Sequence, residues 1–156
     1  MKKHIVCLGD SNTHGYCADP ADCADGGIRF NENDARPLGR TASGVKAITL
    51  RGDDFIIGMC LATEDTQLLA VTEYGYGKRT ELSEYRVQNR GGVGIKTYKC
   101  SEVTGNVVGI RSVKDDEDIM LITSEGVIIR IPADGISTIG RSTKGVRLMR
   151  LADDVK

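Results

Sequence analysis

The sequence RTASGVK at residues 40–46 returns as RGGVGIK at 90–96 and as RSTKGVR at 141–147. The three stretches share an arginine, a glycine four positions later and then an aliphatic and a basic residue, and they begin 50 and 51 positions apart. A second marker, a threonine, a glycine and an arginine, keeps the same period at Thr72, Gly75 and Arg79 and again at Thr123, Gly126 and Arg130. Two markers in one register predict a tandem repeat of about 50 residues.

Within each repeat the sequence predicts short strands joined by tight turns. Residues 119–123 and 127–131 are aliphatic runs on either side of Ser-Glu-Gly, a pattern typical of a hairpin whose glycine adopts a positive φ. Further strands are expected at 68–72, 107–113 and 146–151, and no capped amphipathic helix is found. About four strands per period favour propeller blades over a sandwich, because a sandwich needs no period.

We therefore predict an all-β fold, a partial β-pinwheel or propeller with blades of about 50 residues. The blades are expected at 28–67 (partial), 68–118 (full) and 119–156 (truncated). With only 5 Tyr, 2 Phe and no Trp in 156 residues, the core must come from Val, Ile and Leu. Truncated blades leave open edges, so we expect either marginal stability or self-association of an inert structural fragment.

Three long segments at this period resemble blades of a known family, the C-terminal DNA-wrapping domain of DNA gyrase A and of its topoisomerase IV relative. They are RFNENDARPLGRTASGVKAI (29–48), TEYGYGKRTELSEYRVQNRGGVGIKTYK (72–99) and ITSEGVIIRIPADGISTIGRSTKGVRLMRL (122–151). The resemblance covers 28–156 and is closest to the last two to three blades of what is, in that family, a six-bladed β-pinwheel.

The resemblance implies duplex DNA binding without sequence preference, and bending or wrapping that supports supercoiling by a bacterial, cytoplasmic, ATP-hydrolysing type II topoisomerase. The implied partners are DNA, the rest of gyrase A and the gyrase B subunit. No catalysis is expected of this chain alone, because none of its tyrosines resembles the context of the DNA-cleaving tyrosine. No cofactor or metal is expected, since the chain has two histidines and no CxxC pair.

The loop QNRGGVG is similar to a basic glycine-rich box of the family. It comprises Gln88, Asn89, Arg90, Gly91, Gly92, Val93 and Gly94. Asn89 and Val93 depart from the basic residues of that box, so the loop is interpreted as a degenerate copy with weaker DNA contact.

Charge is unevenly distributed along the chain. The formal net charge is -1, from 21 basic and 22 acidic residues, yet residues 74–114 hold eight basic and three acidic residues. Residues 36–51 hold four basic residues and no acid, whereas 1–27 carry a charge of -2. Recurring cations in the loops of stacked blades would form a stripe, which suits contact with phosphates rather than bases.

The candidate DNA-contacting residues are the cations that recur in the repeats: Arg40, Lys46, Lys78, Arg79, Arg90, Lys96, Arg130, Arg141, Lys144 and Arg147. For the repeated arginines, packing beside the loop glycine is as good an explanation as DNA contact. DNA contact is favoured for Lys78, Arg79, Lys96 and Lys144.

The amino-terminal segment, 1–27, lies outside the repeat register and is not expected to be an independent domain. HIVCLGDSNTHGY (4–16) resembles the first block of the SGNH (GDSL-type) esterases, which would make Ser11 a nucleophile. The late Asp-x-x-His that supplies the base and its orienting acid in that family is absent, since the histidines are His4 and His14. We favour instead an edge strand replacing the opening strand of the first blade.

The junction itself leaves its origin open. GGIRFNE (26–32) fits the continuation of either family. Recombination, construction and an assembly error all remain compatible with the sequence. No apolar run approaches the roughly 18 residues of a membrane span.

Overall fold

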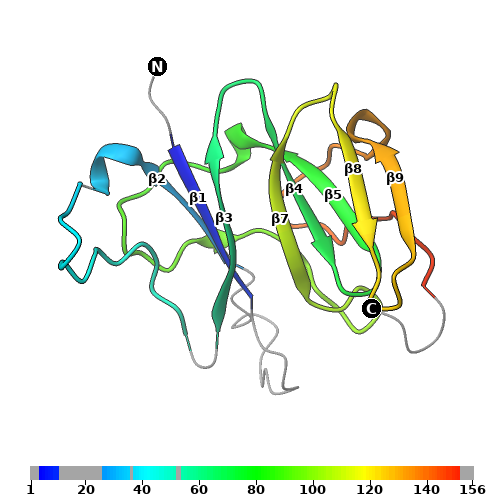
Figure 1. Cartoon of the computed structure of the whole chain (residues 1–156), viewed down its shortest axis with the longest axis horizontal. Helices are drawn as coiled ribbons and strands as arrows, with labels where there is room; N and C mark the ends of the chain where they lie inside the picture. The colour runs from blue at the N-terminus through cyan, green and yellow to red at the C-terminus, as the bar shows by residue number, and fades with distance from the viewer. Residues whose placement is uncertain (1–3, 11–25, 36, 52–53, 152–156) are drawn as a thin grey trace.

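The computed structural model describes residues 4–10, 26–35, 37–51 and 54–151, with the backbone alone at 4–10, 26 and 32. These residues form β-strands and short 3₁₀ turns (Figure 1). The strands are β1 (His4–Asp10), β2 (Gly26–Asn31), β3 (Phe55–Ala62), β4 (Gln67–Thr72), β5 (Tyr76–Glu81), β6 (Ile95–Lys96), β7 (Val107–Val113), β8 (Asp118–Ile122), β9 (Ile128–Pro132) and β10 (Val146–Arg147). The 3₁₀ turns are η1 (Glu32–Asp34), η2 (Leu82–Glu84) and η3 (Ala133–Gly135). The all-β prediction is confirmed.

Two four-stranded sheets lie side by side, and a two-stranded hairpin follows them (Figure 1). The strand orders are β3-β1-β2-β6, β10-β5-β4-β7 and β8-β9, with antiparallel pairing throughout. The outer strand of each four-stranded sheet comes from the repeat that follows in the chain, because β6 joins β2 and β10 joins β5. Successive repeats are therefore interlocked rather than merely stacked.

Most of the strands predicted from the sequence are confirmed. The hairpin forms from β8 and β9, and Gly126 in its turn has a φ of 83°. The strand expected at 146–151 is shorter, since only Val146 and Arg147 pair with β5. Beyond them the amides of Leu148 and Met149 both donate to the Gly75 carbonyl, which ends the ladder.

The amino-terminal strand occupies the middle of a sheet. β1 pairs with β2 on one side and with β3 on the other. It therefore holds the position in the first sheet that β4, paired with β5 and β7, holds in the second. The expectation that this segment completes the first blade is confirmed, but its expected place at the edge is wrong, because both sides of β1 are hydrogen-bonded.

The core lies at the contacts between successive sheets. Ala62 from β3 and Leu68 from β4 pack with Leu82 and Tyr85, all of them buried. Strands β3 and β7 approach closely at Gly58, where a Cβ atom would lie 2.8 Å from Cγ1 of Ile110. These contacts between successive sheets form a buried apolar cluster.

The last hairpin is packed in the same way on the second sheet. Leu69, Val113 and Ile136 form a buried cluster there, and the half-buried Ile119 and Ile131 lie against it. Each repeat consequently buries its apolar face against its neighbour, which is the behaviour expected of a repeat array. Among the described residues no helix is long and apolar enough to cross a membrane.

Candidate nucleic-acid interface

The three arginine-glycine stretches form three surface loops, one in each repeat. We call them the first basic loop (39–46), the second basic loop (89–96) and the third basic loop (140–147). The glycines near their ends, Gly44 and Gly145 among them, have φ values of 82° and 75°. A positive φ is disfavoured for residues with a Cβ, which explains why glycine recurs at this position of the repeat.

Hydrogen bonds between backbones join the loops to one another. The amide of Thr49, just after the first basic loop, donates to the Gly92 carbonyl in the second at 2.8 Å. One repeat further on, the amide of Lys99 donates to the Thr143 carbonyl in the third loop at 3.0 Å. The same bond in two successive repeats places the three loops in one continuous row.

The arginines of the second and third loops reinforce this row. Arg90 donates through Nη1 to the Lys46 carbonyl and through Nε to the Asp34 carbonyl, the latter at 2.9 Å. Arg141 donates through Nη1 to the Lys96 carbonyl at 2.8 Å. Both side chains are half-buried. The structure thus gives these two arginines a packing role, and their contact with DNA stays a prediction.

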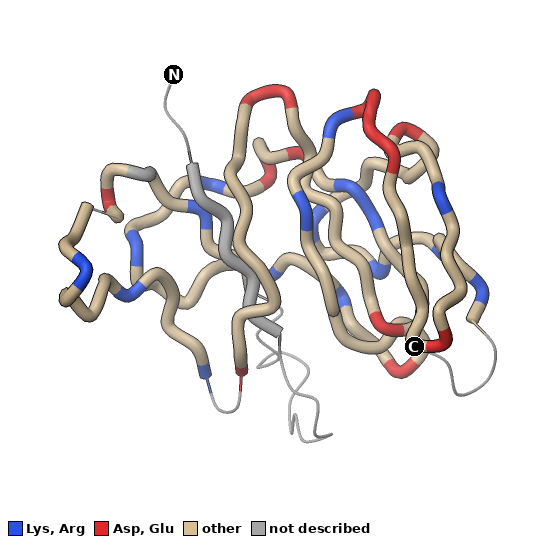
Figure 2. The backbone as a smooth tube through the Cα atoms, viewed as in Figure 1, with Lys and Arg blue, Asp and Glu red and all other residues tan. Residues whose placement is uncertain are grey.

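Five of the predicted cations are exposed on or beside the loops. They are Arg40, Lys46, Lys96, Lys144 and Arg147. The Arg147 guanidinium donates to the Tyr76 hydroxyl at 2.6 Å and lies 5.1 Å from the centre of its ring. Figure 2 shows basic residues along the loops and acidic residues gathered at hairpin turns such as 64–65 and 115–118.

Lys78 and Arg79 lie inside the protein, contrary to the sequence interpretation. Their relative exposures are 0% and 6%, because both belong to β5, which the third repeat covers. Arg79 donates to the Ile136 carbonyl at 2.8 Å and pairs with Asp115. The preference for DNA contact at these two residues is therefore corrected, since their charged groups are occupied by protein partners.

Burial also changes the acidity of Lys78. It lowers the pKa of the ammonium from 10.5 to about 8. The charges of Cys100 and Glu84 act to raise this pKa, and the Arg141 charge acts to lower it. The ammonium lies 4.8 Å from the centre of the Tyr98 ring. Lys78 is consequently an internal cation that loses its proton more easily than a lysine in water.

Arg130 lies apart from the basic loops. It belongs to β9, its side chain is 72% exposed, and its guanidinium pairs with Asp118 across the hairpin. An ion pair this exposed contributes at most about 1 kcal/mol. Arg130 thus remains accessible, but not in the row that the other exposed cations share.

The box-like loop, 88–94, is anchored through its glycines and its first residue. The amide of Gln88 donates to the Arg29 carbonyl at 2.7 Å. Gly91 and Gly94 have φ values of 84° and 80°, and a Cβ atom on Gly94 would lie 2.7 Å from the Gly27 carbonyl oxygen. Val93 is 47% exposed, so the departure from a basic residue leaves an apolar group on the surface.

The structural roles of two residues were not predicted from the sequence. Arg29 donates to the carbonyls of Leu82 and Tyr85 at 2.7 and 3.2 Å, and Tyr98 donates its hydroxyl proton to the Lys144 carbonyl at 2.6 Å. The position of Arg29, 50 residues before Arg79, is the signal that could have indicated a shared role. No periodic signal marks Tyr98.

The proposed nucleophile Ser11 and its neighbour His14 lie outside the described residues. No cluster of three or more potential metal ligands occurs in the part of the chain that the structure describes.

Interlocked four-stranded blades with a 50-residue period and a row of basic loops define a propeller-type repeat protein. The model of the family described as "DNA gyrase C-terminal domain, beta-propeller" matches residues 26–59, 66–114 and 117–156. The chain belongs to this DNA gyrase A C-terminal family.

Relatives and solved structures agree with this assignment. The DNA gyrase A protein of Staphylococcus epidermidis is 53% identical over 128 residues, and that of Staphylococcus aureus is 54% identical over 129, each over 81% of this chain. The chain spans about 14% of the length of these relatives. A solved DNA gyrase A C-terminal domain has a TM-score of 0.82 and 26% identity, covering 99% of this chain and 48% of its own.

A second solved structure shows the same fold. The C-terminal domain of a DNA topoisomerase IV has a TM-score of 0.81 at 20% identity, covering 95% of this chain and 42% of its own.

Proposed function

We propose that this chain binds duplex DNA without sequence preference and bends or wraps it along the row of basic loops. The observation that carries the proposal is that Lys46, Lys96 and Lys144 are exposed on three loops whose backbones are hydrogen-bonded in sequence. Regularly repeated cations neutralise successive phosphates and release counterions, whereas they carry no means of distinguishing bases.

Membership of the gyrase A family supports the wider part of the proposal. In this view the chain contributes DNA wrapping to supercoiling in the bacterial cytoplasm, together with the rest of gyrase A and the gyrase B subunit. It has no catalytic activity of its own and requires no cofactor. Arg40, Arg90, Arg141 and Arg147 add charge to the same row, and Lys78 and Arg79 are left out because they are buried.

The test compares two matched pairs of exposed cations. Lys96→Gln with Lys144→Gln removes two charges from the basic loops, and Arg111→Gln with Lys114→Gln removes two from β7 and its following turn. Binding of a fluorescent duplex is measured between 50 and 200 mM salt, each an ordinary concentration for such work. The loop pair should reduce the log-log salt slope by about 1.8, if each lysine contacts one phosphate.

Two results would contradict DNA binding by the loops. One is a wild-type protein that does not bind duplex at the lowest salt. The other is an equal change of slope in both pairs, which would show that only the total charge matters. A scrambled duplex of the same length should bind with the same affinity as the first.

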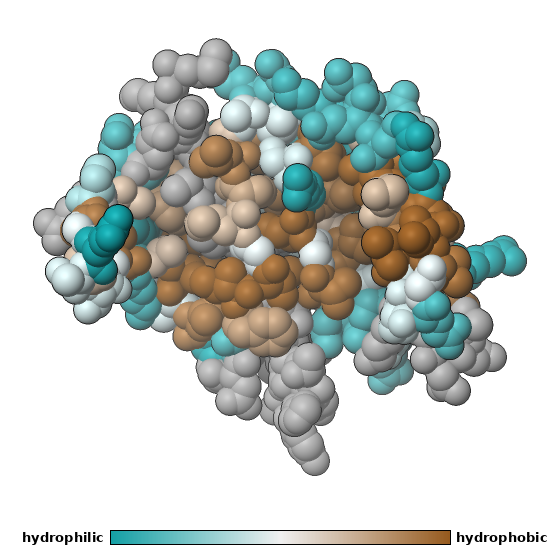
Figure 3. All heavy atoms as spheres, in the orientation of Figure 1, coloured by the Kyte–Doolittle hydropathy of each residue, from teal (hydrophilic) through white to brown (hydrophobic). Residues whose placement is uncertain are grey.

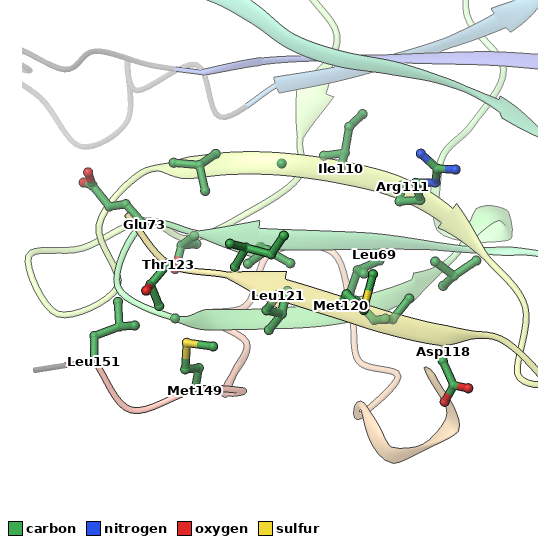
Figure 4. Close-up of a pocket in the computed structure, with 18 of the residues that line it drawn as sticks. Leu69, Glu73, Ile110, Arg111, Asp118, Met120, Leu121, Thr123, Met149 and Leu151 are labelled. Carbon is green, nitrogen blue, oxygen red and sulfur yellow. The ribbon is translucent and has the colours of Figure 1, made fainter. Parts of the chain in front are cut away.

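A second candidate function is self-association, favoured by an exposed apolar face. Met120 and Ile122 on β8 are each 65% exposed, and Met59 on β3 is 67% exposed. Figure 3 shows apolar residues forming a band across this face. A groove of about 950 Å³ lies between β7 and β8, lined by Leu69, Ile110 and Met149 among others (Figure 4).

The missing neighbour of β8 supports a second copy as the partner. In the described residues β8 pairs only with β9, whereas its counterparts β1 and β4 each have strands on both sides. Sedimentation should show a dimer that Ile122→Lys dissociates, and a monomer at all concentrations would exclude it.

A further inference from the structure

The buried ammonium of Lys78 lies beneath the third basic loop and is surrounded by backbone carbonyls. Its three N–H groups are shared among four carbonyls, those of Thr97 at 2.9 Å, Gly140 at 3.0 Å and Thr143 at 3.3 Å and that of Arg141. The Thr143 hydroxyl lies 3.2 Å away. Three of the four carbonyls belong to the loop itself, so one cation sets the direction of three peptide groups in its first half.

The direction of these carbonyls determines where the amides point. In a planar trans peptide the N–H of the next residue points opposite to the carbonyl. The carbonyls of 140, 141 and 143 converge on Nζ, and the N–H groups of Arg141, Ser142 and Lys144 therefore point away from the interior. No hydrogen bond joins these three amides to another described residue. They are thus available to an acceptor from outside.

The fold does not require a charge at this position. Ile28, 50 residues earlier, is fully buried under the second basic loop, where a Cβ atom on Gly92 would lie 3.6 Å from its Cδ1. Ile129, 51 residues later, stands at the same place in the last hairpin and is half-buried. Two of three repeats therefore use an apolar residue where Lys78 carries an ammonium.

We propose that Lys78 is a positioning residue, which holds the third basic loop with the amides of Arg141, Ser142 and Lys144 turned outward, where they donate to phosphate oxygens of the DNA backbone. The inference rests on the proposed DNA binding and adds a specific contact to it. Outward backbone N–H groups are among the donors that proteins use to contact DNA phosphate oxygens. The exposed Lys144 side chain on the same loop supplies the accompanying positive charge.

The buried charge makes this arrangement rigid. Turning any of the three loop peptides would remove an acceptor from a desolvated ammonium, which is costly for a charged group. The Tyr98 hydroxyl donates to the Lys144 carbonyl at 2.6 Å and restrains the other end of the loop. A loop already fixed in its binding conformation loses less conformational entropy when the phosphate arrives.

The test replaces the ammonium while keeping the apolar stem. Lys78→Met removes the charge, and Lys78→Ile introduces the residue that the other repeats carry. Both variants should remain folded, with hydrogen exchange accelerated about tenfold or more at the amide of Lys99, which donates to the Thr143 carbonyl of the loop. DNA affinity should fall about tenfold, the equivalent of one well-made contact. The second basic loop, at 89–96, serves as the internal control for exchange.

Chemical rescue separates positioning from a general loss of structure. Lys78→Ala leaves a space the size of n-propylammonium, so that ion should restore affinity and slow exchange of the Lys99 amide. Neutral n-propanol and an equal concentration of tetramethylammonium chloride should not. Rescue by all three would indicate a solvent or salt effect and would overturn the proposal.

The outcomes distinguish this inference from the function on which it rests. If the wild type binds DNA and Lys78→Met binds equally well, the positioning role is wrong and DNA binding stands. Unchanged exchange of the Lys99 amide in both variants has the same consequence. If the wild type does not bind DNA, the proposed function fails and this inference fails with it.

Discussion

Arg79 and Arg130 stand 51 positions apart at the same place in successive repeats, yet Arg79 is buried and the Arg130 side chain is 72% exposed. Arg79 donates to the Ile136 carbonyl just after η3 of the following repeat, at 2.8 Å. Arg29 makes the corresponding contact one repeat earlier, with Tyr85. Arg79, which is buried, and Arg29, which is half-buried, therefore each tie their sheet to the 3₁₀ turn of the next repeat.

Replacing Arg79 and Arg130 should have very different effects on stability. Arg79→Ala leaves buried carbonyls without a donor and should lower the free energy of unfolding by about 3 kcal/mol. Arg130→Ala removes an exposed ion pair and should change it by less than about 0.5 kcal/mol. Urea unfolding followed by circular dichroism measures both. Equal losses in the free energy of unfolding would contradict the conclusion that Arg79 ties its sheet to the next repeat.

The loop glycines should differ according to what surrounds them. A Cβ atom on Gly145 would lie 2.7 Å from the Gly77 carbonyl oxygen and would also meet the Tyr98 hydroxyl, whereas nothing lies within 4 Å of one on Gly44. Both have positive φ. Gly44→Ala should cost about 1 kcal/mol from the backbone alone, and Gly145→Ala about 3 kcal/mol or more.

The same unfolding experiment measures the two glycine variants. A Gly44→Ala protein as unstable as Gly145→Ala would show that backbone conformation, and not the close approach of β5, requires glycine in this loop.

The free energy of unfolding should depend on pH through Lys78. Burial lowers the pKa of its ammonium to about 8 in the folded protein, from 10.5. Between these values the unfolded chain binds the proton and the folded protein does not, so stability rises with pH from about 8 toward 10.5. Below pH 8 both states are charged, and the cost of burying the ammonium is fully present.

The control for this pH dependence is Lys78→Met, which keeps the other polar and charged groups near the site. Arg141, Glu84, Cys100 and Tyr98 face the ammonium and remain in the variant. The stability of the wild type relative to Lys78→Met should increase between pH 7 and pH 9.5. A difference that stays constant over that range would contradict the lowered pKa.

Two tyrosines offer another matched comparison. Tyr98 is fully buried and its hydroxyl donates to the Lys144 carbonyl at 2.6 Å, whereas Tyr76 accepts from the exposed Arg147. Tyr98→Phe should lower the free energy of unfolding by about 1–2 kcal/mol, because the carbonyl loses its buried donor. Tyr76→Phe should lower it by less than about 0.5 kcal/mol. A thermal melt distinguishes the two, and similar shifts would refute the assignment.

The strands and turns could be predicted because their signals are local. The 107–113 strand and the β8–β9 hairpin follow from aliphatic runs and the Gly126 turn, and the structure confirms them. The inner position of β1 could not be predicted, since a strand's neighbours depend on pairing with residues far away in the chain. Its partner β3 begins 45 residues after β1 ends, and nothing in either strand specifies that pairing.

The sequence predicted the exposure of some of the cations in the repeats but not of others. Lys46, Lys96 and Lys144 are exposed as a loop position implies, and their alignment follows from the period. Lys78 and Arg79 carry the same charge in the same repeat, yet the next repeat covers both. Local charge cannot reveal this, because a lysine that faces carbonyls and one that faces water look alike in a sequence.

The sequence by itself determined the period, the β-strands and the glycines of the loops, since these depend on backbone preferences within a few residues. Only the tertiary structure decided which cations face outward. The third basic loop covers Lys78 and the segment 134–139 covers Arg79, whereas the Arg130 side chain is 72% exposed. At this repeat position, Arg79 is therefore buried and hydrogen-bonded to the next repeat, whereas Arg130 is a surface charge.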